Sequence, residues 1–469
     1  MKVVETWQTE RQEDSAVDLE ELDQAVAHLR ILTGRSPHAV HVCQSKGTSI
    51  GRVGGGCDVV VDDGRMSRRH ARVERGMTGW HLQDVGARNR GFVDGRGYGA
   101  GERVPLVDGA VVRLGDTLMV FRASPPTGDG KSDSHVFPGS STRAVAVRRR
   151  IDLLAAGTGH VLILGETGTG KDYVAKAIGE QRAPHPFVTL NSAQLSRELA
   201  RSELFGHVRG AFTNASSHKV GLVDLAGDGV LFLDEIGELP LDVQAELLRF
   251  LEDGSYRPLG STELRHSNAR IVAATNVDLE QAVQNNKFRK DLLARLRASN
   301  VPLELPPLRE RREDILGWTQ LFFRRDNCDP GPDPWTVGAL ECLLLFPWSE
   351  NLRELGNVVK GVAELGIFPC ATEYLRADLQ AHRGALRAAL GVPPQDEPTP
   401  TRAAASGPQK QPQPEPTRAE IEDALRTTAG RMRPAALLLG IDRRRLYRLC
   451  ERFGIARESY RADTNREDE

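Results

Sequence analysis

Polar and apolar residues alternate in short runs through the first part of the chain. Such runs lie at residues 38–43, 58–61, 71–74 and 80–83, with Gly- and Asp-containing turns between them. Alternation with a period of two is typical of strands that have one face in a core, and frequent turns are typical of antiparallel sheets. The pattern predicts a small all-β sandwich over residues 35–123.

Continuous apolar runs replace this alternation in the middle of the chain. Residues 161–164 and 230–233 contain no polar side chain, and the run at 271–274 ends in polar groups. Short uninterrupted runs of this kind are typical of parallel strands that are buried on both faces. We therefore predict a second, α/β domain over residues 139–310.

Two segments that are poor in apolar residues divide the chain. Residues 124–138 are rich in turn formers, and eight prolines lie between Pro393 and Pro416 in a stretch without aromatic residues. Neither composition can form a packed core. We predict linkers at 124–138 and 387–417, a third folded block at 418–461, a lead-in at 1–34 and a tail at 462–469.

Composition narrows the class of protein. The 469 residues include 62 basic and 64 acidic ones, and this net charge of −2 argues against a general nucleic-acid coat but leaves local patches open. The six cysteines never approach CxxC spacing, so neither a zinc site nor a disulfide framework is indicated. No apolar stretch approaches the roughly 20 residues that span a bilayer, and no signal-peptide core begins the chain. We expect a soluble, cytoplasmic protein with no membrane partner.

A glycine loop follows the first continuous apolar run directly. Residues 165–172 read Gly-Glu-Thr-Gly-Thr-Gly-Lys-Asp, and a helix-like stretch follows at 173–180. This order lets backbone N–H groups and a helix N-terminus converge on a polyphosphate, with a lysine charge on its terminal phosphates. The sequence predicts a nucleotide phosphate cradle made of Gly165, Glu166, Thr167, Gly168, Thr169, Gly170, Lys171 and Asp172.

Acidic residues near this loop are candidates for metal binding and catalysis. Asp172 stands where a phosphate loop usually has the Ser or Thr that holds Mg²⁺, and a carboxylate can serve the same ion. The run at 230–233 ends in Asp234 and Glu235, at the predicted carboxyl edge of the sheet. We assign Asp234 and Asp172 to Mg²⁺ and Glu235 to polarising a water. Together with the loop, these acids favour hydrolysis of a nucleoside triphosphate over a helix-cap role.

Three loops of the predicted sandwich carry a known combination of residues. Gly51-Arg52, the Ser-Arg-Arg-His sequence at 67–70 and the Asn-containing stretch at 84–95 resemble the forkhead-associated (FHA) domain. That family has a Gly-Arg pair, then Ser-x-x-His, then an Asn-Gly loop. Here Arg88 stands in place of the threonine that often precedes the asparagine, so it either substitutes for that threonine or alters specificity.

The FHA resemblance implies a phosphothreonine site. It assigns the phosphate to Arg52 and Ser67, makes Arg68 and Asn89 flanking contacts, and gives His70 the role of bracing the loop. An arginine with a serine hydroxyl is suitable chemistry for a dianionic phosphate. The alternative for the two arginines is a solvated surface position.

Residues 136–386 resemble the AAA+ domain of sigma-54-dependent transcriptional activators. The glycine loop with an acid after it, a hinge at 305–315 and the stretch at 348–355 follow the family pattern. The resemblance implies a helical lid at 311–386, ATP with Mg²⁺ as ligands, and assembly into a ring.

The same resemblance assigns further residues to the ATP site. It implies that Asn191 restrains Glu235. Arg289 and Arg295, which alone would look like surface charges, become the arginines that reach the ATP of the neighbouring subunit. The remaining ATP contacts that it implies are Thr275, Asn276 and the second sensor arginine, Arg353.

The stretch at 202–215 carries the signature surface loop of that family. Phe212 and Thr213 would contact the sigma factor, and an exposed loop aromatic favours a partner surface. Asn214 replaces a glycine of the family pattern, although asparagine also tolerates the left-handed backbone conformation.

The last block is small and basic. Residues 431–461 contain nine arginines and three acids, and the apolar spacing at 435–450 predicts two short helices joined by a glycine turn. This all-α block resembles the Fis-type helix-turn-helix of the same activators. A dimerisation module with a solvated arginine face is the alternative. The residues that we assign to DNA contacts are Arg443, Arg444, Arg445, Tyr447 and Arg448.

Together the blocks predict a multidomain sigma-54-dependent regulator. We expect a homo-oligomer, from dimer to hexamer, that binds upstream DNA and uses ATP hydrolysis to remodel sigma-54 RNA polymerase to the open complex. Phosphothreonine on this chain or on a partner, written by a Ser/Thr kinase, would regulate it through the FHA domain. The alternative is a phosphopeptide-regulated DNA-binding repressor or scaffold with an AAA+ fold, which Asn214 supports. A P-loop kinase is disfavoured because the arginine set is that of a ring ATPase.

Overall fold

The computed structural model describes most of the predicted blocks. The described residues are 26–33, 39–44, 46–126, 136–180, 184–212, 215–388 and 416–428, and then 435, 439, 446, 449–450 and 452–455. Most of the predicted lead-in, of both linkers and of the tail lies outside these ranges. Among the helices within them, none is long and apolar enough to cross a bilayer.

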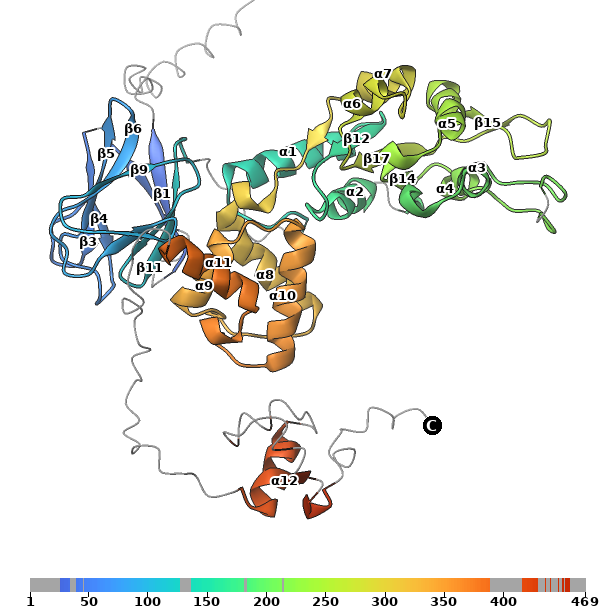
Figure 1. Ribbon diagram of the computed structural model, residues 1–469. Coiled ribbons are helices and arrows are strands. Elements are labelled where there is room, and N and C mark those ends of the chain that lie inside the picture. Colours follow the sequence, from blue (N-terminus) through green and yellow to red (C-terminus); the bar gives the residue numbers. More distant parts are fainter. Residues whose placement is uncertain are drawn as a thin grey trace, which may run out of the picture.

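The first block is a sandwich of two sheets, drawn in blue in Figure 1. One sheet has the strand order β2 (Val40–Cys43), β1 (Ala27–Ile31), β11 (Thr117–Arg122), β10 (Val111–Leu114), β7 (Gly91–Val93) and β8 (Arg96–Tyr98). The other has the order β4 (Val59–Val61), β3 (Thr48–Arg52), β5 (Ala71–Gly76), β6 (Gly79–Asp84) and β9 (Arg103–Leu106). Only β3 and β4 pair in parallel. The predicted all-β sandwich is therefore confirmed.

The sandwich begins before its predicted boundary at residue 35. Strand β1 pairs with β11 on one side and β2 on the other, and all of its residues are buried. Leu29 and Ile31 face the core of the sandwich, so the polar His28 and Arg30 face the opposite side. Those polar residues hid the strand in the sequence, because a buried outer face requires a second domain to cover it.

The second block contains a five-stranded parallel sheet with the order β13 (Phe187–Asn191), β14 (Val230–Asp234), β17 (Arg270–Thr275), β12 (Val161–Leu164) and β18 (Leu303–Glu304). Alternate residues of β12 belong to two different apolar clusters, so both faces of the sheet are buried, as predicted. The helices of this block are α1 (Thr142–Ala156), α2 (Lys171–Glu180), α3 (Arg197–Phe205), α4 (Leu222–Ala226), α5 (Leu241–Asp253), α6 (Leu279–Gln284) and α7 (Lys290–Ser299). A hairpin of β15 (Ser255–Tyr256) and β16 (Arg265–His266) follows α5.

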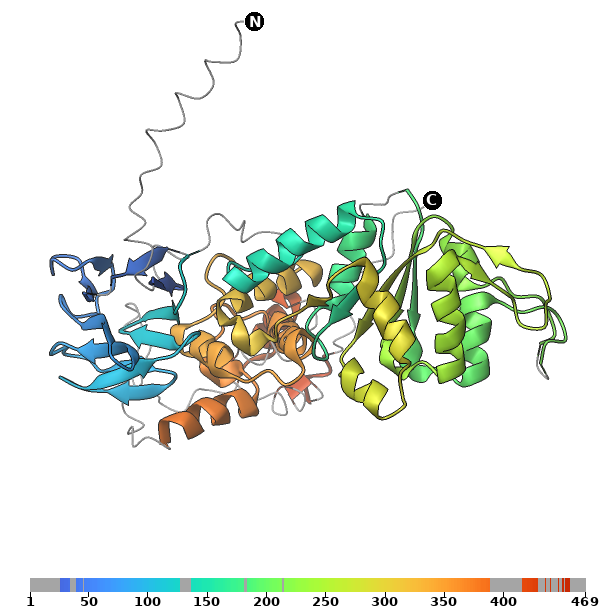
Figure 2. The ribbon, with the colours of Figure 1, turned by 90° about the horizontal axis from the view of Figure 1, so that it is seen from above.

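Helices form a lid between the sandwich and the α/β domain, as Figure 2 shows from above. They are α8 (Ile315–Arg325), α9 (Val337–Leu345), α10 (Asn351–Leu365) and α11 (Ala377–Ala388). Two short 3-10 helices, η3 (Leu308–Glu310) and η4 (Arg312–Asp314), lead into α8, and η5 (Thr372–Tyr374) precedes α11. These helices lie within residues 315–388, and the sequence analysis expects the lid at 311–386.

The described part of the last block contains α12 (Arg418–Thr427). The side chain of Thr417 accepts the N–H of Glu420, whose carboxylate accepts the N–H of Thr417, so the helix starts with a reciprocal capping box. Ile421 and Leu425 contribute to a small apolar cluster with Leu446 and Leu449. The predicted helix-turn-helix lies mostly outside the described residues and stays a prediction.

Candidate functional site

The glycine loop lies between β12 and α2, where the sequence predicts it. Gly168 and Gly170 have φ angles of +75° and +101°, which favour glycine. A Cβ on Gly168 would lie 2.1 Å from the carbonyl oxygen of Glu350 in the lid, so no larger residue fits here without movement. The backbone of Leu352 donates to the carbonyl oxygen of Gly168 at 2.8 Å. Lid and loop are therefore in direct contact.

Lys171 points back into the loop. Its Nζ donates to the carbonyl oxygens of Gly165 at 3.0 Å and Glu166 at 3.2 Å, and it lies 3.9 Å from Glu235 Oε1. Burial lowers the pKa of Lys171, while the nearby carboxylates oppose this effect. Since a charge-assisted bond to a phosphate is stronger than one to a neutral carbonyl, a phosphate oxygen would displace these carbonyl partners.

A cavity of about 300 Å³ opens beside the loop, a size within the range of ligand pockets. Most of the predicted ATP residues line it: Thr167, Gly168, Gly170, Lys171, Asp172, Asp234, Glu235 and Arg353. Sequence reasoning missed four further lining residues, Tyr173, Phe322, Arg325 and Leu352. The Arg325 guanidinium lies 4.9 Å from the centroid of the Phe322 ring. These side chains combine flat apolar surface with a charge. Tyr173 belongs to α2, and only the folded lid brings Phe322, Arg325 and Leu352 to the cavity.

The two acids at the end of β14 differ in their environments. Burial and the charge of Glu235 raise the pKa of the Asp234 carboxyl. Glu235 has a left-handed backbone with φ of +54°, and its Oε2 accepts the N–H of Asn276 at 3.2 Å. A non-glycine residue in this conformation is uncommon and is often found at functional sites.

Asn191 does not contact the residue that we expected. Its amide donates to Asp234 Oδ2 at 3.3 Å, whereas we had assigned it to restrain Glu235. The register of the sheet explains the difference, because β13 and β14 pair Asn191 directly with Asp234. This contact orients the carboxylate that we assign to Mg²⁺.

Two residues at the end of β17, Thr275 and Asn276, contact the phosphate loop. Asn276 Nδ2 donates to Thr167 Oγ1 at 2.8 Å, so it contacts the phosphate loop, but it is not among the described residues that line the cavity. The Thr275 side chain is buried and accepts the N–H of Val277, while its carbonyl oxygen accepts the N–H of Gly165. Thr275 therefore supports the loop and is not among the lining residues that the structure describes.

Mg²⁺ fits the residues at this cavity. Asp172 and Asp234 both line it, and each oxygen of the Asp234 carboxylate accepts one hydrogen bond, Oδ2 from Asn191 and Oδ1 from the N–H of Glu235, which leaves each oxygen a second lone pair for an ion. The described residues contain no cluster of three or more His, Cys, Asp or Glu side chains that would hold a metal alone. Mg²⁺ usually binds one or two carboxylates together with substrate phosphates and water, so two carboxylates suffice.

Two lid residues that the sequence analysis did not single out hold Glu166. Arg309 donates to both carboxylate oxygens, at 2.8 Å and 2.6 Å, and Asn351 donates at 3.2 Å. These hydrogen bonds lower the pKa of Glu166. Asn351 also donates to the carbonyl oxygen of Thr167 at 3.0 Å. Glu166 is therefore a structural anchor for the loop. Glu166, the half-buried Gly165 and the buried Thr169 are not among the described residues that line the cavity.

Arg289 and Arg295 are not among the described residues that line the cavity of their own chain. Arg289 precedes α7 and forms a two-pronged ion pair with Asp291, with bonds of 3.0 Å and 2.7 Å. Arg295 donates to the carbonyl oxygen of Leu251 at 2.8 Å. Both residues are partly exposed.

The signature loop protrudes from the α/β domain beyond α3 and α4, at the right of Figure 1. Phe212 is half-buried and packs edge-on against His207, with ring centroids 5.0 Å apart. The loop rests on the neighbouring β15–β16 connection, since Val208 donates to the carbonyl oxygen of Leu259. Thr213 and Asn214 lie outside the described residues.

A second cavity lies at the loops of the sandwich. Its lining includes every phosphothreonine residue that we predicted, with three arginines in addition: Arg52, Arg65, Ser67, Arg68, Arg69, Arg88 and Asn89. No acidic side chain is among its described lining residues. A pocket of this charge suits an anion.

Hydrogen bonds tie the three sandwich loops together. Ser67 Oγ accepts the N–H of Arg88 at 2.9 Å, and Asn89 Nδ2 donates to the carbonyl oxygen of Arg65 at 2.7 Å. His70 Nδ1 accepts the N–H of Ser67 at 3.2 Å, so this histidine braces the loop, as predicted. Burial lowers the pKa of His70, which keeps the ring neutral and able to accept.

The predicted DNA contacts cannot be placed. Arg443, Arg444, Arg445, Tyr447 and Arg448 all lie outside the described residues. Their assignment stays a prediction from the sequence.

Comparisons with known proteins assign a family to each of the two parts of the chain that contain the cavities. The family model for the sigma-54 interaction domain matches residues 137–302, and the model for the FHA domain matches residues 48–115. The nitric oxide reductase transcription regulator NorR1 of Cupriavidus necator is 34% identical over 395 residues, which cover 80% of this chain and 76% of that protein. The alginate biosynthesis transcriptional regulatory protein AlgB of Pseudomonas aeruginosa is 39% identical, covering 70% of this chain and 68% of that protein. The Nif-specific regulatory protein of Bradyrhizobium diazoefficiens is 41% identical, covering 55% and 44%.

Proposed function

Because the chain belongs to the sigma-54-dependent transcriptional regulators, with an FHA domain and an AAA+ domain, we propose that it is a ring-forming ATPase that drives sigma-54 RNA polymerase to the open complex. The observation that carries this proposal is the cavity in which Lys171, Asp234 and Glu235 converge beside the glycine loop. A phosphate cradle, a metal-binding carboxylate and a second carboxylate for water are the parts that phosphoryl transfer to water requires.

Each residue of the cavity has a distinct role in this proposal. Lys171 binds the terminal phosphates of ATP, and Glu235, held by the backbone of Asn276, accepts a proton from the attacking water. Asp234, oriented by Asn191, and Asp172 would hold Mg²⁺, which when bound neutralises charge on the phosphates. Arg353 adds a charge from the lid side.

The two arginines that act on each ATP would come from the next subunit of the ring. Arg289 and Arg295 lie off the cavity of their own chain, so each can act only on the ATP of a neighbour. An arginine supplied in trans stabilises charge on the transferring phosphoryl group and is worth about 10³–10⁵ in rate in well-studied cases. Hydrolysis would then depend on assembly.

The other blocks connect this motor to its partners. Phe212 and Thr213 would contact sigma-54, and the arginines of the last block would contact upstream DNA. The pocket at Arg52 and Ser67 would bind a phosphothreonine protein, which places a Ser/Thr kinase upstream.

A trapped complex tests the proposal. ADP with aluminium fluoride mimics the transferring phosphoryl group, so we would measure binding of purified sigma-54 to the trapped protein. Wild type should bind, Thr213→Ala should not, and Thr78→Ala, an exposed threonine of the sandwich, should bind like wild type. Robust ATP hydrolysis with no sigma-54 binding in any variant would reject the activator and leave the repressor or scaffold.

A further inference from the structure

The FHA sandwich and the helical lid share one buried core. Apolar side chains of the outer sandwich face join the same cluster as residues of α9, namely Leu32, Val111, Leu118 and Val120 with Leu340, Leu343 and Leu344. A contact of this kind orders the two domains relative to each other. It also explains why β1 and β11 are buried on both faces.

Buried ion pairs cross the same interface. Arg122 of β11 forms a two-pronged pair with Glu313 of η4, in which Nε lies 2.8 Å from Oε1, and both side chains are at most 7% exposed. Arg113 of β10 lies 2.9 Å from Glu341 of α9, with exposures of 4% and 1%. Charges buried to this degree cost desolvation energy unless they are paired, so these pairs specify one docked geometry.

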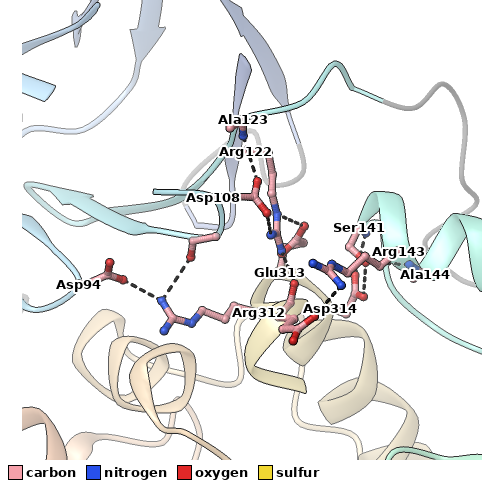
Figure 3. Close-up of polar contacts among 12 residues, drawn as sticks. Asp94, Asp108, Arg122, Ala123, Ser141, Arg143, Ala144, Arg312, Glu313 and Asp314 are labelled. Atoms are coloured by element: carbon pink, nitrogen blue, oxygen red, sulfur yellow. Dashed lines mark hydrogen bonds and ion pairs between the residues drawn. The ribbon is translucent and has the colours of Figure 1, made fainter. Parts of the chain in front are cut away.

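Besides α9, the sandwich contacts the segment 310–313 at the start of the lid, as Figure 3 shows. Arg312 donates to Asp94 Oδ1 at 2.7 Å and to the carbonyl oxygen of Gly109 at 3.2 Å. Arg122 additionally donates to the carbonyl oxygen of Glu310 at 2.9 Å. The sandwich thus forms hydrogen bonds with both the side chains and the backbone of this short segment.

The same segment holds the phosphate loop from its other side. Arg309 binds the Glu166 carboxylate with two hydrogen bonds, and Arg311 donates to the carbonyl oxygen of Thr169 at 3.0 Å. Asp314 accepts both the N–H and the O–H of Ser141 at the start of α1. Neighbouring residues of one turn therefore contact the FHA domain and the nucleotide loop.

The FHA pocket lies close to the gripping residues along the chain. Asn89 lines the pocket, and the three-residue strand β7 leads from its loop to Asp94. Arg65, which also lines the pocket, pairs with Asp116 at 3.3 Å in the turn between β10 and β11. Those two strands carry Arg113 and Arg122.

We propose that residues 309–314 are a positioning segment that couples the FHA pocket to the ATP site. The docked sandwich fixes the segment, and the segment fixes the phosphate loop in the shape that binds ATP. This inference rests on the proposed binding of ATP, and it assigns to the FHA domain a route for regulation within one subunit.

Buried polar groups at the interface both stabilise and destabilise the docked form, so a ligand can shift the equilibrium between docked and undocked forms. Two arginines at the interface, one buried and one half-buried, have a nitrogen without a hydrogen-bond partner among the described residues: Arg30 Nε and Arg312 Nε. Unsatisfied buried donors oppose the stabilisation that the ion pairs supply. A modest difference in phosphopeptide affinity between docked and undocked forms then changes their populations.

The test measures ATP binding by the full chain with a fluorescent ATP analogue. Arg312→Gln removes the ion pair with Asp94 and should raise the Kd for the analogue about tenfold. Arg312→Lys should restore most of the affinity. Asp94→Asn removes the charge of the same ion pair from the FHA side, without touching the lid. Glu74→Gln is the matched control, because it removes a partly exposed carboxylate that pairs with Arg103 at 2.9 Å on the other sheet.

A second readout separates coupling from a general loss of stability. Binding of the analogue should slow hydrogen exchange in β10 and β11 of wild type and of Glu74→Gln, but not of Arg312→Gln or Asp94→Asn. Equal Kd values and equal exchange in all variants would overturn the inference. If wild type itself fails to bind the analogue, the proposed function fails instead. Should Arg312→Gln prove unstable, Asp94→Asn decides the question.

Discussion

The chain carries two phosphate sites that are built on opposite plans. At the nucleotide loop one lysine is surrounded by carboxylates, and it already has hydrogen-bond partners within the loop. At the FHA pocket Arg52, Arg68, Arg69 and Arg88 line the cavity without an acidic side chain among its described lining residues. The first site is nearly balanced in charge, and the second is strongly cationic.

The difference follows from what each phosphate must do. A site that hydrolyses a phosphate needs carboxylates for metal and water, and these in turn require neighbouring cations. A site that only holds a dianion needs donors and no acid. The two sites should therefore respond differently to the loss of a single charged group.

The largest effects are expected in the nucleotide cavity. Glu235→Gln removes the acceptor for the water proton and should lower kcat for ATP hydrolysis by about 10²–10⁴-fold, with ATP binding kept. Lys171→Ala should instead weaken ATP binding about 100-fold, because it removes a charged hydrogen-bond donor. Steady-state kinetics with a separate binding assay distinguish the two. Equal loss of binding in both variants would contradict the separate roles.

A similar loss is expected from a residue outside the cavity. Arg289→Ala should lower kcat about 100-fold or more while leaving the Kd for ATP unchanged, because the arginine acts on the neighbour. Mixing it with Lys171→Ala subunits provides the control. In the mixture, an Arg289→Ala subunit has an intact cavity, and a neighbouring Lys171→Ala subunit supplies an intact Arg289. The mixture should therefore regain activity that neither variant has alone. No recovery on mixing would argue against a role in trans.

A smaller effect is expected in the FHA pocket. Arg52→Ala removes one of several arginines, so the affinity for phosphothreonine peptides should fall about 10- to 100-fold without reaching zero. A degenerate phosphothreonine peptide pool measured by fluorescence anisotropy supplies the assay. Arg75→Ala is the matched control, since Arg75 is an exposed arginine of β5 outside the pocket. Equal binding by both variants would show that the phosphate lies elsewhere.

The last effect is expected at Asp314, a buried carboxylate of the segment 309–314. Burial raises the pKa of the Asp314 carboxyl to about 6, so the folded protein binds this proton more tightly than the unfolded chain. The contribution to stability is therefore greatest at low pH and is lost as pH rises through about 6. Wild type should lose on the order of 1–3 kcal/mol relative to Asp314→Asn between pH 4.5 and 7.5. A pH-independent difference in denaturant unfolding would contradict this.

The sequence predicted local features well. The glycine loop, the acids after β14 and the sandwich loops follow one another within short stretches, so their chemistry is visible in the order of residues. Lys171, Asp234 and Arg52 all line the cavities to which they were assigned. Backbone turns and strand ends place such residues without help from distant parts of the chain.

Contacts between distant segments were not predictable. Arg113 and Glu341 are separated by 228 positions, and both belong to elements whose own patterns indicate only burial. Arg309 and Asn351 hold Glu166 from 143 and 185 positions away, and no periodicity encodes such contacts. Asn191 contacts Asp234 and not Glu235 because of the register between β13 and β14. The sequence of a single parallel strand does not reveal that register. Strand β1 was missed for the same reason, since its outer face is buried by another domain.

The most direct test of the ring ATPase is the rate of ATP hydrolysis per subunit as a function of protein concentration, at saturating ATP. We predict a steep rise from near zero to a plateau, since each cavity needs the arginines of a neighbour to complete it. A rate per subunit that stays constant over the whole concentration range would contradict the account, because the cavity would then be complete within one chain.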